Sequence, residues 1–472
     1  MQKTHLRLMA VTLLSVLACG PAGDAAIDIG NRWELLIDHY LIDRMVGTAT
    51  LRPHKPVARE VVMVHDQPWE GNTSGYHTVF RDGELYRMYY RGWGHDKEAG
   101  KQLHPAVVCY AESQDGIHWK KPVLGIVEFK GSSENNIIIG DFGTHNFTPF
   151  KDTNPDCPPE ARYKAVARGE GDDKGKLFAF QSADAIDWKR LQLKPIITDG
   201  AFDSQNLAFW DTLRGEYRCY FRDFRAGYRD IKTSTSPDFV HWSEPRWLRY
   251  GDVPKEHLYT NQIQPYYRAP HILLGFPTRY IPDRGSLTEG LLMSSRDGLE
   301  FHRRREAIIR PGRNPDKWYN RSNYIWLGLV ETQAHIQRAG TELSLYSNES
   351  YYKGQGARTR RYTYRIDGFV SLHARMAGGE MTTKPLLFEG NALVLNVSTS
   401  AAGSVRVEIQ NEAGNPIEGY RLRDCTEVYG DDIERSVEWR RNDVAQLAGR
   451  VVRLRFVLRD ADVFAFGFKD LN

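Results

Sequence analysis

The stretch SQDGIHW, residues 113–119, decides the fold because it recurs along the chain. Related copies are SADAIDW at 182, SPDFVHW at 236, SRDGLEF at 295 and the weaker RIDGFVSL at 365. The third position of every copy is an aspartate: Asp115, Asp184, Asp238, Asp297 and Asp367. Repeats spaced by about 54 to 70 residues, in a chain rich in strand-forming segments, are typical of β-propeller blades.

The repeated motif has a structural explanation. Ser and Asp side chains hydrogen-bond the backbone groups of a turn, and Gly accepts a positive φ. A catalytic carboxylate is not needed five times. We therefore interpret the motif as a turn at a blade edge, closed by a Trp or Phe that packs against a neighbouring blade. In this respect the motif resembles the Asp-box of sialidase-type propellers.

Each copy belongs to a run of strand-forming segments. Before the first copy these are GYHTVF, ELYRMYYRG and VVCYAE, and a fourth segment follows the motif. The sequence therefore predicts an all-β protein with a five-bladed β-propeller over residues 27–375, with four strands to a blade. The segment WELLIDHYLIDR, 33–44, is expected to be an N-terminal strap. The alternating strands of 376–472, which lack the motif, predict a C-terminal β-sandwich.

The first 26 residues are typical of an export signal. Lys3 and Arg7 precede the apolar run MAVTLLSVLA, which is too short to span a bilayer as a helix of the mature chain. We expect cleavage near Ala26 and a periplasmic or extracellular protein, and Cys19 offers lipid anchoring as an alternative. No later segment predicts a transmembrane helix. The pairing of the four remaining cysteines stays open: Cys109, Cys157, Cys219 and Cys425.

The composition limits the classes of partner. The formal net charge of +3 is small for 472 residues and argues against a nucleic-acid partner. A phosphate loop is absent, and the cysteines are too widely spaced for a zinc knuckle, so we expect no cofactor and no metal. The oligomeric state stays open.

A binding rim follows from the strand order. In a four-stranded blade the first strand begins, and the second strand ends, at the face opposite the repeated turns. Polar side chains converging there are costly unless they meet water or a ligand, or pair with one another as a plug. The predicted substrate-binding residues on this rim are Tyr76, His77, Arg91, Trp93, Arg168, Gln205, Asn206, Arg222, Asn261, Gln262, Arg279 and Asn323.

Four carboxylates near the same rim are candidates for catalysis. Glycoside hydrolysis needs one carboxylic acid that protonates the leaving oxygen and one carboxylate that acts as a base or nucleophile. We predict Asp203 or Asp223 for the base or stabiliser, and Glu349 or Glu289 for the acid. The arginines at second-strand ends suit a carboxylate or sulfate of the substrate, because each guanidinium offers a fork of donors: Arg91, Arg168, Arg222 and Arg279.

Five blades with a trailing sandwich resemble the glycosidase superfamily of families 32, 43 and 68. The resemblance implies glycoside hydrolysis on a propeller axis, with departures from the family's motifs. The segment WMNDPNG is absent, Tyr76-His77 stands where such enzymes carry an Asp, and Arg222-Asp223-Phe224 lacks the Pro of an Arg-Asp-Pro motif.

The functional prediction is an exported glycoside hydrolase that acts on a plant or algal polysaccharide or oligosaccharide, with an acidic or sulfated glycan as one option. The alternatives are a non-catalytic carbohydrate-binding propeller and a polysaccharide lyase that uses Tyr76 and His77 to abstract a proton.

Overall fold

The computed structural model describes residues 25–96, 98–440 and 443–471. The predicted signal segment falls almost entirely outside these residues, and so does Cys19. Among the described residues no helix has the length and apolar character needed to cross a membrane. The described chain is built of strands, and its helices are short 3-10 turns: η1 (Pro159–Ala161), η2 (Gly171–Asp173), η3 (Pro282–Arg284), η4 (Pro315–Lys317) and η5 (Val444–Leu447).

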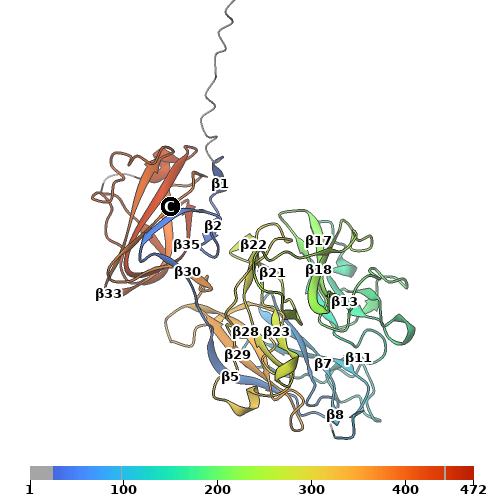
Figure 1. The fold of residues 1–472 in the computed structure, drawn as a ribbon. Coiled ribbons are helices and arrows are strands. Elements are labelled where there is room, and N and C mark those ends of the chain that lie inside the picture. Colours follow the sequence, from blue (N-terminus) through green and yellow to red (C-terminus); the bar gives the residue numbers. More distant parts are fainter. Residues whose placement is uncertain (1–24, 97, 441–442, 472) are drawn as a thin grey trace, which may run out of the picture.

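Five four-stranded antiparallel sheets follow one another along the chain (Figure 1). The first pairs β6 (Gly75–Asp82), β7 (Leu85–Gly92), β10 (Val107–Ser113) and β11 (Ile137–Ile139). The second pairs β12 (Thr148–Lys151), β13 (Tyr163–Arg168), β14 (Leu177–Ser182) and β15 (Lys189–Arg190). The third pairs β16 (Leu207–Asp211), β17 (Glu216–Arg225), β18 (Tyr228–Ser236) and β19 (Arg246–Trp247).

The last two sheets are less regular. The fourth pairs β21 (Gln264–Tyr266), β22 (Ala269–Gly275), β25 (Met293–Ser295) and β26 (His302–Arg303). A separate sheet consists of β20 (His257–Leu258), which precedes β21, and of β23 (Thr278–Ile281) and β24 (Leu287–Gly290), which lie between β22 and β25 in the chain. The fifth pairs β27 (Val330–Gln333), β28 (Thr341–Glu349), β29 (Arg358–Tyr364) and β5 (Val57–Val64). A small hairpin joins β8 (His95–Asp96) and β9 (Lys101–Gln102).

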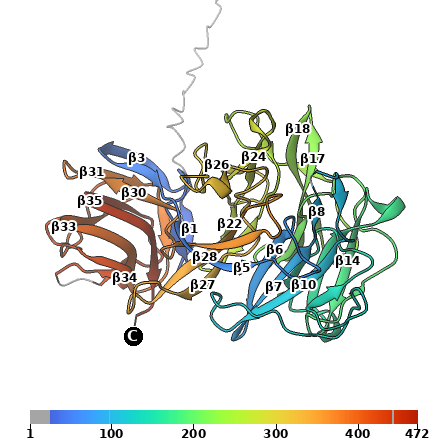
Figure 2. The ribbon, with the colours of Figure 1, turned by 90° about the horizontal axis from the view of Figure 1, so that it is seen from below.

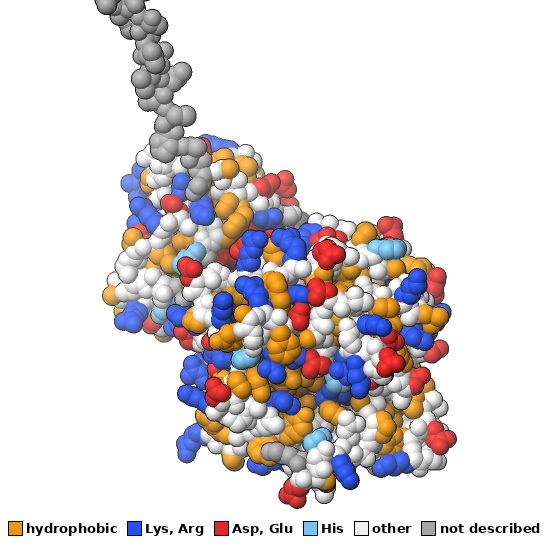
Figure 3. Space-filling model, turned by 45° about the vertical axis from the view of Figure 1, so that its right-hand side comes forward, with side chains coloured by type: hydrophobic (Ala, Val, Ile, Leu, Met, Phe, Trp, Pro, Cys, Tyr) orange, Lys and Arg blue, Asp and Glu red, His pale blue; other side chains and the backbone are white. Residues whose placement is uncertain are grey.

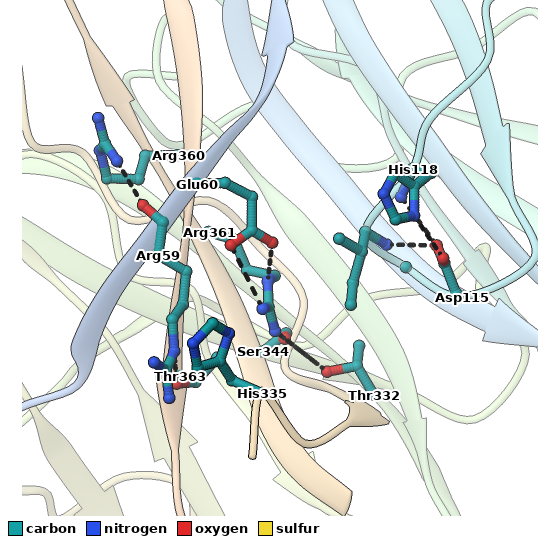
Figure 4. A network of polar contacts seen from close by, with 12 residues as sticks. Arg59, Glu60, Asp115, His118, Thr332, His335, Ser344, Arg360, Arg361 and Thr363 are labelled. Carbon is teal, nitrogen blue, oxygen red and sulfur yellow. Dashed lines mark hydrogen bonds and ion pairs between the residues drawn. The ribbon is translucent and has the colours of Figure 1, made fainter. Parts of the chain in front are cut away.

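The fifth sheet combines the two ends of this part of the chain, because β5 precedes the first sheet and pairs with β29. A buried guanidinium joins these strands: Arg361 on β29 donates to Glu60 on β5 at 2.7 Å (Figure 4). Arg361 also donates to Glu342 and Ser344 on β28, at 3.1 Å each. A longer bond of 3.5 Å to Thr332 on β27 completes the set, so one residue connects all four strands.

The first strands of the five sheets, or the residues just before them, lie around one cavity. Val79 on β6 donates its backbone N–H to the carbonyl of Leu327, just before β27, at 2.8 Å. A cavity of about 430 Å³ is lined by one or more residues from the innermost segment of every sheet: Val79, Phe150, Phe209, Ile263 and Leu327 among them. This cavity lies on the side where first strands end.

Four copies of the repeated motif form the same turn where a third strand ends. In the first copy, Ser113 Oγ donates to Asp115 Oδ1 at 2.9 Å, and the backbone N–H groups of Ile117 and His118 donate to the same carboxylate oxygen at 2.8 Å. The copies at 182, 236 and 295 repeat these bonds. The residue after each aspartate has a positive φ: Gly116, Ala185, Phe239 and Gly298.

The fifth aspartate, Asp367, has a different environment. Its carboxylate is fully buried and accepts from Tyr266 of the fourth sheet at 2.6 Å and from Asn396 of the C-terminal sheet at 2.9 Å. Arg268 lies 3.4 Å from it. The weak fifth copy therefore joins two parts of the molecule.

The C-terminal part is one ten-stranded sheet organised by two long strands, β33 (Ala392–Asn411) and β35 (Val452–Lys469). Shorter strands pair along them: β30 (Val370–Ala374), β31 (Gly379–Thr383), β32 (Leu386–Phe388) and β34 (Asp431–Val437). Alternating apolar side chains of the long strands are completely buried: Val405, Val407, Ile409, Leu454, Phe456 and Leu458.

The N-terminal segment belongs to this same sheet. Its strands are β1 (Ile27–Gly30), β2 (Trp33–Leu35), β3 (Ile42–Gly47) and β4 (Thr50–Pro53), which pair with β32, β35, β31 and β30 respectively. Figures 1 and 2 show them in blue among the orange and red C-terminal strands. The strap expected at 33–44 thus contributes strands to the C-terminal sheet. The domain limits 27–375 and 376–472 stay predictions.

Candidate functional site

Basic and aromatic side chains gather at the face where first strands begin and second strands end. We call Arg91, Arg168, Arg222, Arg229 and Arg321 the arginine cluster. We call Tyr76, Tyr259, Tyr324 and Tyr351 the tyrosine cluster. Their members come from all five repeat units, and the repeated turns lie at the opposite face.

The tyrosine cluster is packed around the ring of Tyr324. The ring centroids of Tyr76, Tyr259 and Tyr351 lie 6.0, 5.4 and 5.9 Å from that of Tyr324. All four side chains are buried. The Tyr324 hydroxyl is buried without a hydrogen-bond partner, which is costly in a closed core.

Guanidinium groups cover the faces of these rings. Arg222, Arg229 and Arg321 lie 4.9, 5.2 and 5.9 Å from the ring centroid of Tyr259. Arg91 lies 4.8 Å from that of Tyr76 and donates to the Tyr351 hydroxyl at 2.9 Å. Cations over aromatic faces are stabilised by the ring quadrupole, so the tyrosines allow the arginines to approach one another.

The arginine cluster carries more positive charge than its acidic neighbours balance. Within the described part of the chain, its one ion pair joins Arg222 to Asp203. Buried nitrogens without hydrogen-bond partners occur in every member: Nε of Arg91, Arg168, Arg222, Arg229 and Arg321, and Nη1 of Arg222. Over the face seen in Figure 3, blue basic and red acidic side chains are interspersed, so such an excess is local.

The excess charge changes the pKa of its neighbours. Burial, with Arg91 and Arg222 nearby, lowers the pKa of Arg168, and Glu170 opposes this shift. Burial and the same guanidinium groups hold the pKa of His145 well below its usual range. The cluster therefore favours neutral or anionic groups beside it.

The pKa values of two tyrosines of the cluster are shifted in opposite directions. Burial raises the pKa of Tyr76 well above 10, and Tyr259 and Tyr351 add to this effect. Burial acts in the same direction on Tyr259, but Arg321, Arg222 and Arg229 outweigh it and lower the pKa of that phenol below 10. The difference arises because three guanidinium groups face the Tyr259 ring.

The predicted catalytic pair in the third sheet is split between two environments. Asp203, whose side chain is 49% exposed, pairs with Arg222 in the cluster. Asp223 instead pairs with Lys232 at 2.7 Å. Successive side chains of a strand point to opposite faces, so Arg222 and Asp223 cannot both face the cluster. The structure brings Asp203 to the site and directs Asp223 away from it.

Arg279 and Glu289 lie in the separate sheet of β20, β23 and β24. They are directly opposite one another on β23 and β24 and form an ion pair at 2.6 Å. Glu256 contacts Arg279 at 2.9 Å. Pro277 lacks a backbone N–H, and β22 ends two residues before it, so β22 does not continue into β23. These two residues therefore form their own charge network.

Glu349 is buried beside Arg360, which donates to it at 2.6 and 3.1 Å. Lys317 lies near this pair and donates to Tyr362. Burial lowers the pKa of Lys317 to about 8, Glu349 opposes this shift, and Arg360 adds to it. The carboxylate is thus held in an ion pair with Arg360, and among the described residues it forms no hydrogen bond or ion pair with the arginine cluster.

The predicted amide ligands and His77 are buried in the framework beneath the site. Gln262 donates to Gln205 at 2.7 Å, and Gln205 donates to the carbonyl of His77 at 3.1 Å. The His77 ring contacts His65 and stacks on Tyr90. The remaining amides donate to backbone carbonyls: Asn206, Asn261 and Asn323. Trp93, by contrast, lies at the cluster, with its ring 4.5 Å from Arg91.

The sequence analysis did not select Tyr259, Arg229, Arg321, Tyr324 or Tyr351. Arg229 lies at the start of β18, the third strand of its sheet. Tyr259 and Arg321 lie in loops shortly before first strands. Widening the rim to third-strand starts and preceding loops would have found these three.

The four described cysteines carry free thiols: Cys109, Cys157, Cys219 and Cys425. Burial raises the pKa of Cys219 and holds that of Cys109 well above its usual range. Buried neutral thiols are inert, so these two belong to the core.

No family model matches the chain. Two relatives, the uncharacterized proteins MT1551 and Rv1502 of Mycobacterium tuberculosis, are each 29% identical to it over 153 residues. The match covers 31% of this chain, and it spans only 42% of each relative's length.

Solved structures similar to this chain include a glycoside hydrolase with a TM-score of 0.45 and 13% identity, covering 66% of this chain and 92% of that one. An N-acetylgalactosamine deacetylase from F. plautii, in complex with blood group B trisaccharide, has a TM-score of 0.43 and 11% identity, covering 68% and 96%. The catalytic domain of a Coprinopsis cinerea GH62 α-L-arabinofuranosidase has a TM-score of 0.42 and 8% identity, covering 66% and 97%.

Proposed function

We propose that the protein is an exported glycoside hydrolase that acts on an anionic poly- or oligosaccharide. In this proposal the five four-stranded sheets are the blades of one β-propeller, and the ten-stranded sheet is an accompanying β-sandwich. The active site is the axial face that carries the arginine and tyrosine clusters.

The observation that supports an anionic substrate is the unbalanced arginine cluster. Five guanidinium groups share one ion-paired carboxylate among the described residues, and each keeps a buried nitrogen without a partner. Buried donors of this kind are expensive unless a ligand or water satisfies them. A carboxylate or sulfate on a sugar would accept from several of them, and charge-assisted bonds are the strong ones.

Two carboxylates accompany the cluster and can divide the hydrolytic roles. Asp203 pairs with Arg222, which favours its ionised form, so we assign it as base or nucleophile. Glu170 lies near Arg168, accepts from Thr144 at 3.3 Å and forms no ion pair among the described residues. We assign it as the general acid because it is the second carboxylate at the cluster and has no ion pair that would have to break when it takes up a proton.

A lyase is a second candidate function, favoured by the position of Tyr259. A phenol beside three guanidinium groups could abstract a proton from a uronate sugar whose carboxylate the arginines neutralise. The lyase that used Tyr76 and His77 finds less support, because the His77 ring is enclosed by His65, Tyr90 and Trp326.

A panel of neutral, uronated and sulfated glycans, followed by product analysis, tests the proposal. Hydrolysis adds water across the bond, elimination leaves an unsaturated sugar, and a binding protein leaves the glycan unchanged. On a verified substrate, Asp203→Asn and Glu170→Gln are expected to lower turnover on the order of a hundredfold or more. Asp223→Asn is the matched control and should retain near-normal turnover. Elimination products or unchanged glycans throughout would refute the hydrolase.

A further inference from the structure

The phenol of Tyr259 is surrounded by ionisable groups from several elements. Arg222 on β17, Arg229 on β18 and Arg321 in the loop before β27 lie over its ring. Tyr280 on β23 and Tyr324 lie 5.5 and 5.4 Å from it, centroid to centroid. Tyr76 and Tyr351 complete its ionisable surroundings, and Asp203 acts through Arg222.

These surroundings make Tyr259 and a bound anion alternatives. A phenolate at Tyr259 would supply one negative charge to guanidinium groups that carry little other compensation. An anion held by the same guanidinium groups would supply that charge instead, and a phenolate beside it would be repelled. Occupation of the site and ionisation of Tyr259 therefore oppose each other.

We propose that Tyr259 is a proton-exchanging group coupled to anion binding. Over the pH range in which Tyr259 titrates, its phenol gives its proton to water while the arginines are free, and takes one proton back when an anion occupies them. The inference rests on the proposed function only in identifying that anion with the acidic group of the substrate. Binding would then deliver one proton into the site beside the reacting sugar.

Linkage fixes the size of the effect. If the anion binds the form with neutral Tyr259, its dissociation constant rises by up to about tenfold for each pH unit above the midpoint of the Tyr259 titration. The coupling is reciprocal, so a saturating anion moves that midpoint to higher pH by the same free energy. Inorganic sulfate is a suitable probe because it does not titrate in this range.

The first experiment follows phenolate absorbance in the near ultraviolet as pH is raised, on the full chain with and without sulfate. One tyrosine is expected to ionise before the others, and sulfate should delay that step. Tyr259→Phe should remove the step, and the neighbouring control Tyr280→Phe should keep it. A step that survives in Tyr259→Phe, or that sulfate does not move, overturns the proposal.

A second variant keeps the phenol and removes one cation. Arg229→Gln should shift the ionisation of Tyr259 to higher pH and weaken the binding of sulfate. An unchanged midpoint in this variant contradicts the coupling between Tyr259 and the bound anion. The sulfate dissociation constant should lose its alkaline rise in Tyr259→Phe. These readouts use no glycan: a failed glycan screen with a normal titration refutes only the proposed hydrolase, and a failed titration with confirmed hydrolysis refutes only the role of Tyr259.

Discussion

At single positions, the neighbours Arg222 and Asp223 show how strand alternation selects what the site contains. Arg222 is almost fully buried, lies over Tyr259 and holds Asp203, and Asp223 is paired with Lys232 on the other face. Two adjacent residues of one strand thus differ in location: Arg222 lies in the site, and Asp223 forms an ion pair outside it. We therefore expect substitutions of Arg222 to affect the site more than those of Asp223.

We predict that Arg222→Ala weakens the binding of an anionic glycan far more than the binding of its neutral analogue. Loss of a charge-assisted contact should cost about 1.5–3 kcal/mol of binding free energy for the anionic ligand. Calorimetric titration of both ligands measures the difference. Arg279→Ala, which removes a guanidinium from the separate sheet, serves as the control. Equal losses for both ligands would contradict an anion site at this residue.

At the level of strands and turns, the closure of the fifth sheet depends on one buried cation. The Arg361 side chain is 2% exposed and contacts Glu60, Glu342 and Ser344, so β5, β28 and β29 share it (Figure 4). A buried charge that loses its partner is costly, and here Glu342 would lose a partner. The closure is therefore a sensitive point for stability.

We predict that Arg361→Ala lowers the free energy of unfolding by about 3–5 kcal/mol, the scale for breaking a buried ion pair. Chemical denaturation measures the change. Arg81→Ala is the matched control, because its pair with Glu84 is exposed and worth at most about 1 kcal/mol. Similar losses in both variants would show that the buried network does not hold the sheet closed.

The repeated turns predict a graded series. Asp115→Ala removes bonds from a carboxylate that is 42% exposed, so we expect a loss of about 1–2 kcal/mol of stability without loss of activity per folded molecule. Asp367→Ala leaves Tyr266, Asn396 and Arg268 without their buried partner, and we expect the free energy of unfolding to fall by about 3–5 kcal/mol. Thermal unfolding of the two variants ranks them, and a larger loss for Asp115→Ala would contradict the assignment.

For the whole molecule, Glu34 joins the N-terminal strands to the fourth repeat. Its fully buried carboxylate lies 2.9 Å from Arg296, in the repeated motif, and 3.2 Å from His271. Burial alone would raise its pKa, but His271, Arg296 and Arg32 lower it to about 2, from an ordinary value of 4.5. The contact between the two parts of the molecule therefore depends on an ionised carboxylate.

We predict that protonation of Glu34 in acid weakens the contact between the N-terminal strands and the fourth repeat, and so lowers the stability of the protein. A carboxyl with a depressed native pKa stabilises the fold fully above its unfolded pKa, and this contribution is lost as pH falls from about 4.5 to about 2. Melting temperatures measured between pH 7 and pH 2 should fall through this window. Glu34→Gln should be less stable at neutral pH and lose less on acidification. An identical pH dependence in the variant would contradict this account.

The fold was accessible from sequence where the interactions are local. The turn at Ser113 to His118 is closed by bonds within six residues, so the same letters form the same turn at four places and reveal the repeat. The alternation of apolar and polar residues likewise predicts the strands of the C-terminal part. The pairing of residues 27–53 with the C-terminal sheet is non-local, so no pattern within that segment predicts it. The export signal and the catalytic roles stay predictions.

The site required the tertiary structure. Strand order alone decides which strand ends share a face, so the sequence predicts Arg91, Arg168, Arg222 and Asp203 on one rim, and the structure places them near one another at the arginine cluster. The sequence could not separate Arg222 from Asp223, since a facing side chain depends on register to a single residue. Nor could it bring Arg229 and Arg321 to Tyr259, because these residues come from segments distant in the chain that meet only in the tertiary structure. The excess positive charge of the arginine cluster arises only when these distant segments meet, so no local pattern of residues predicts it.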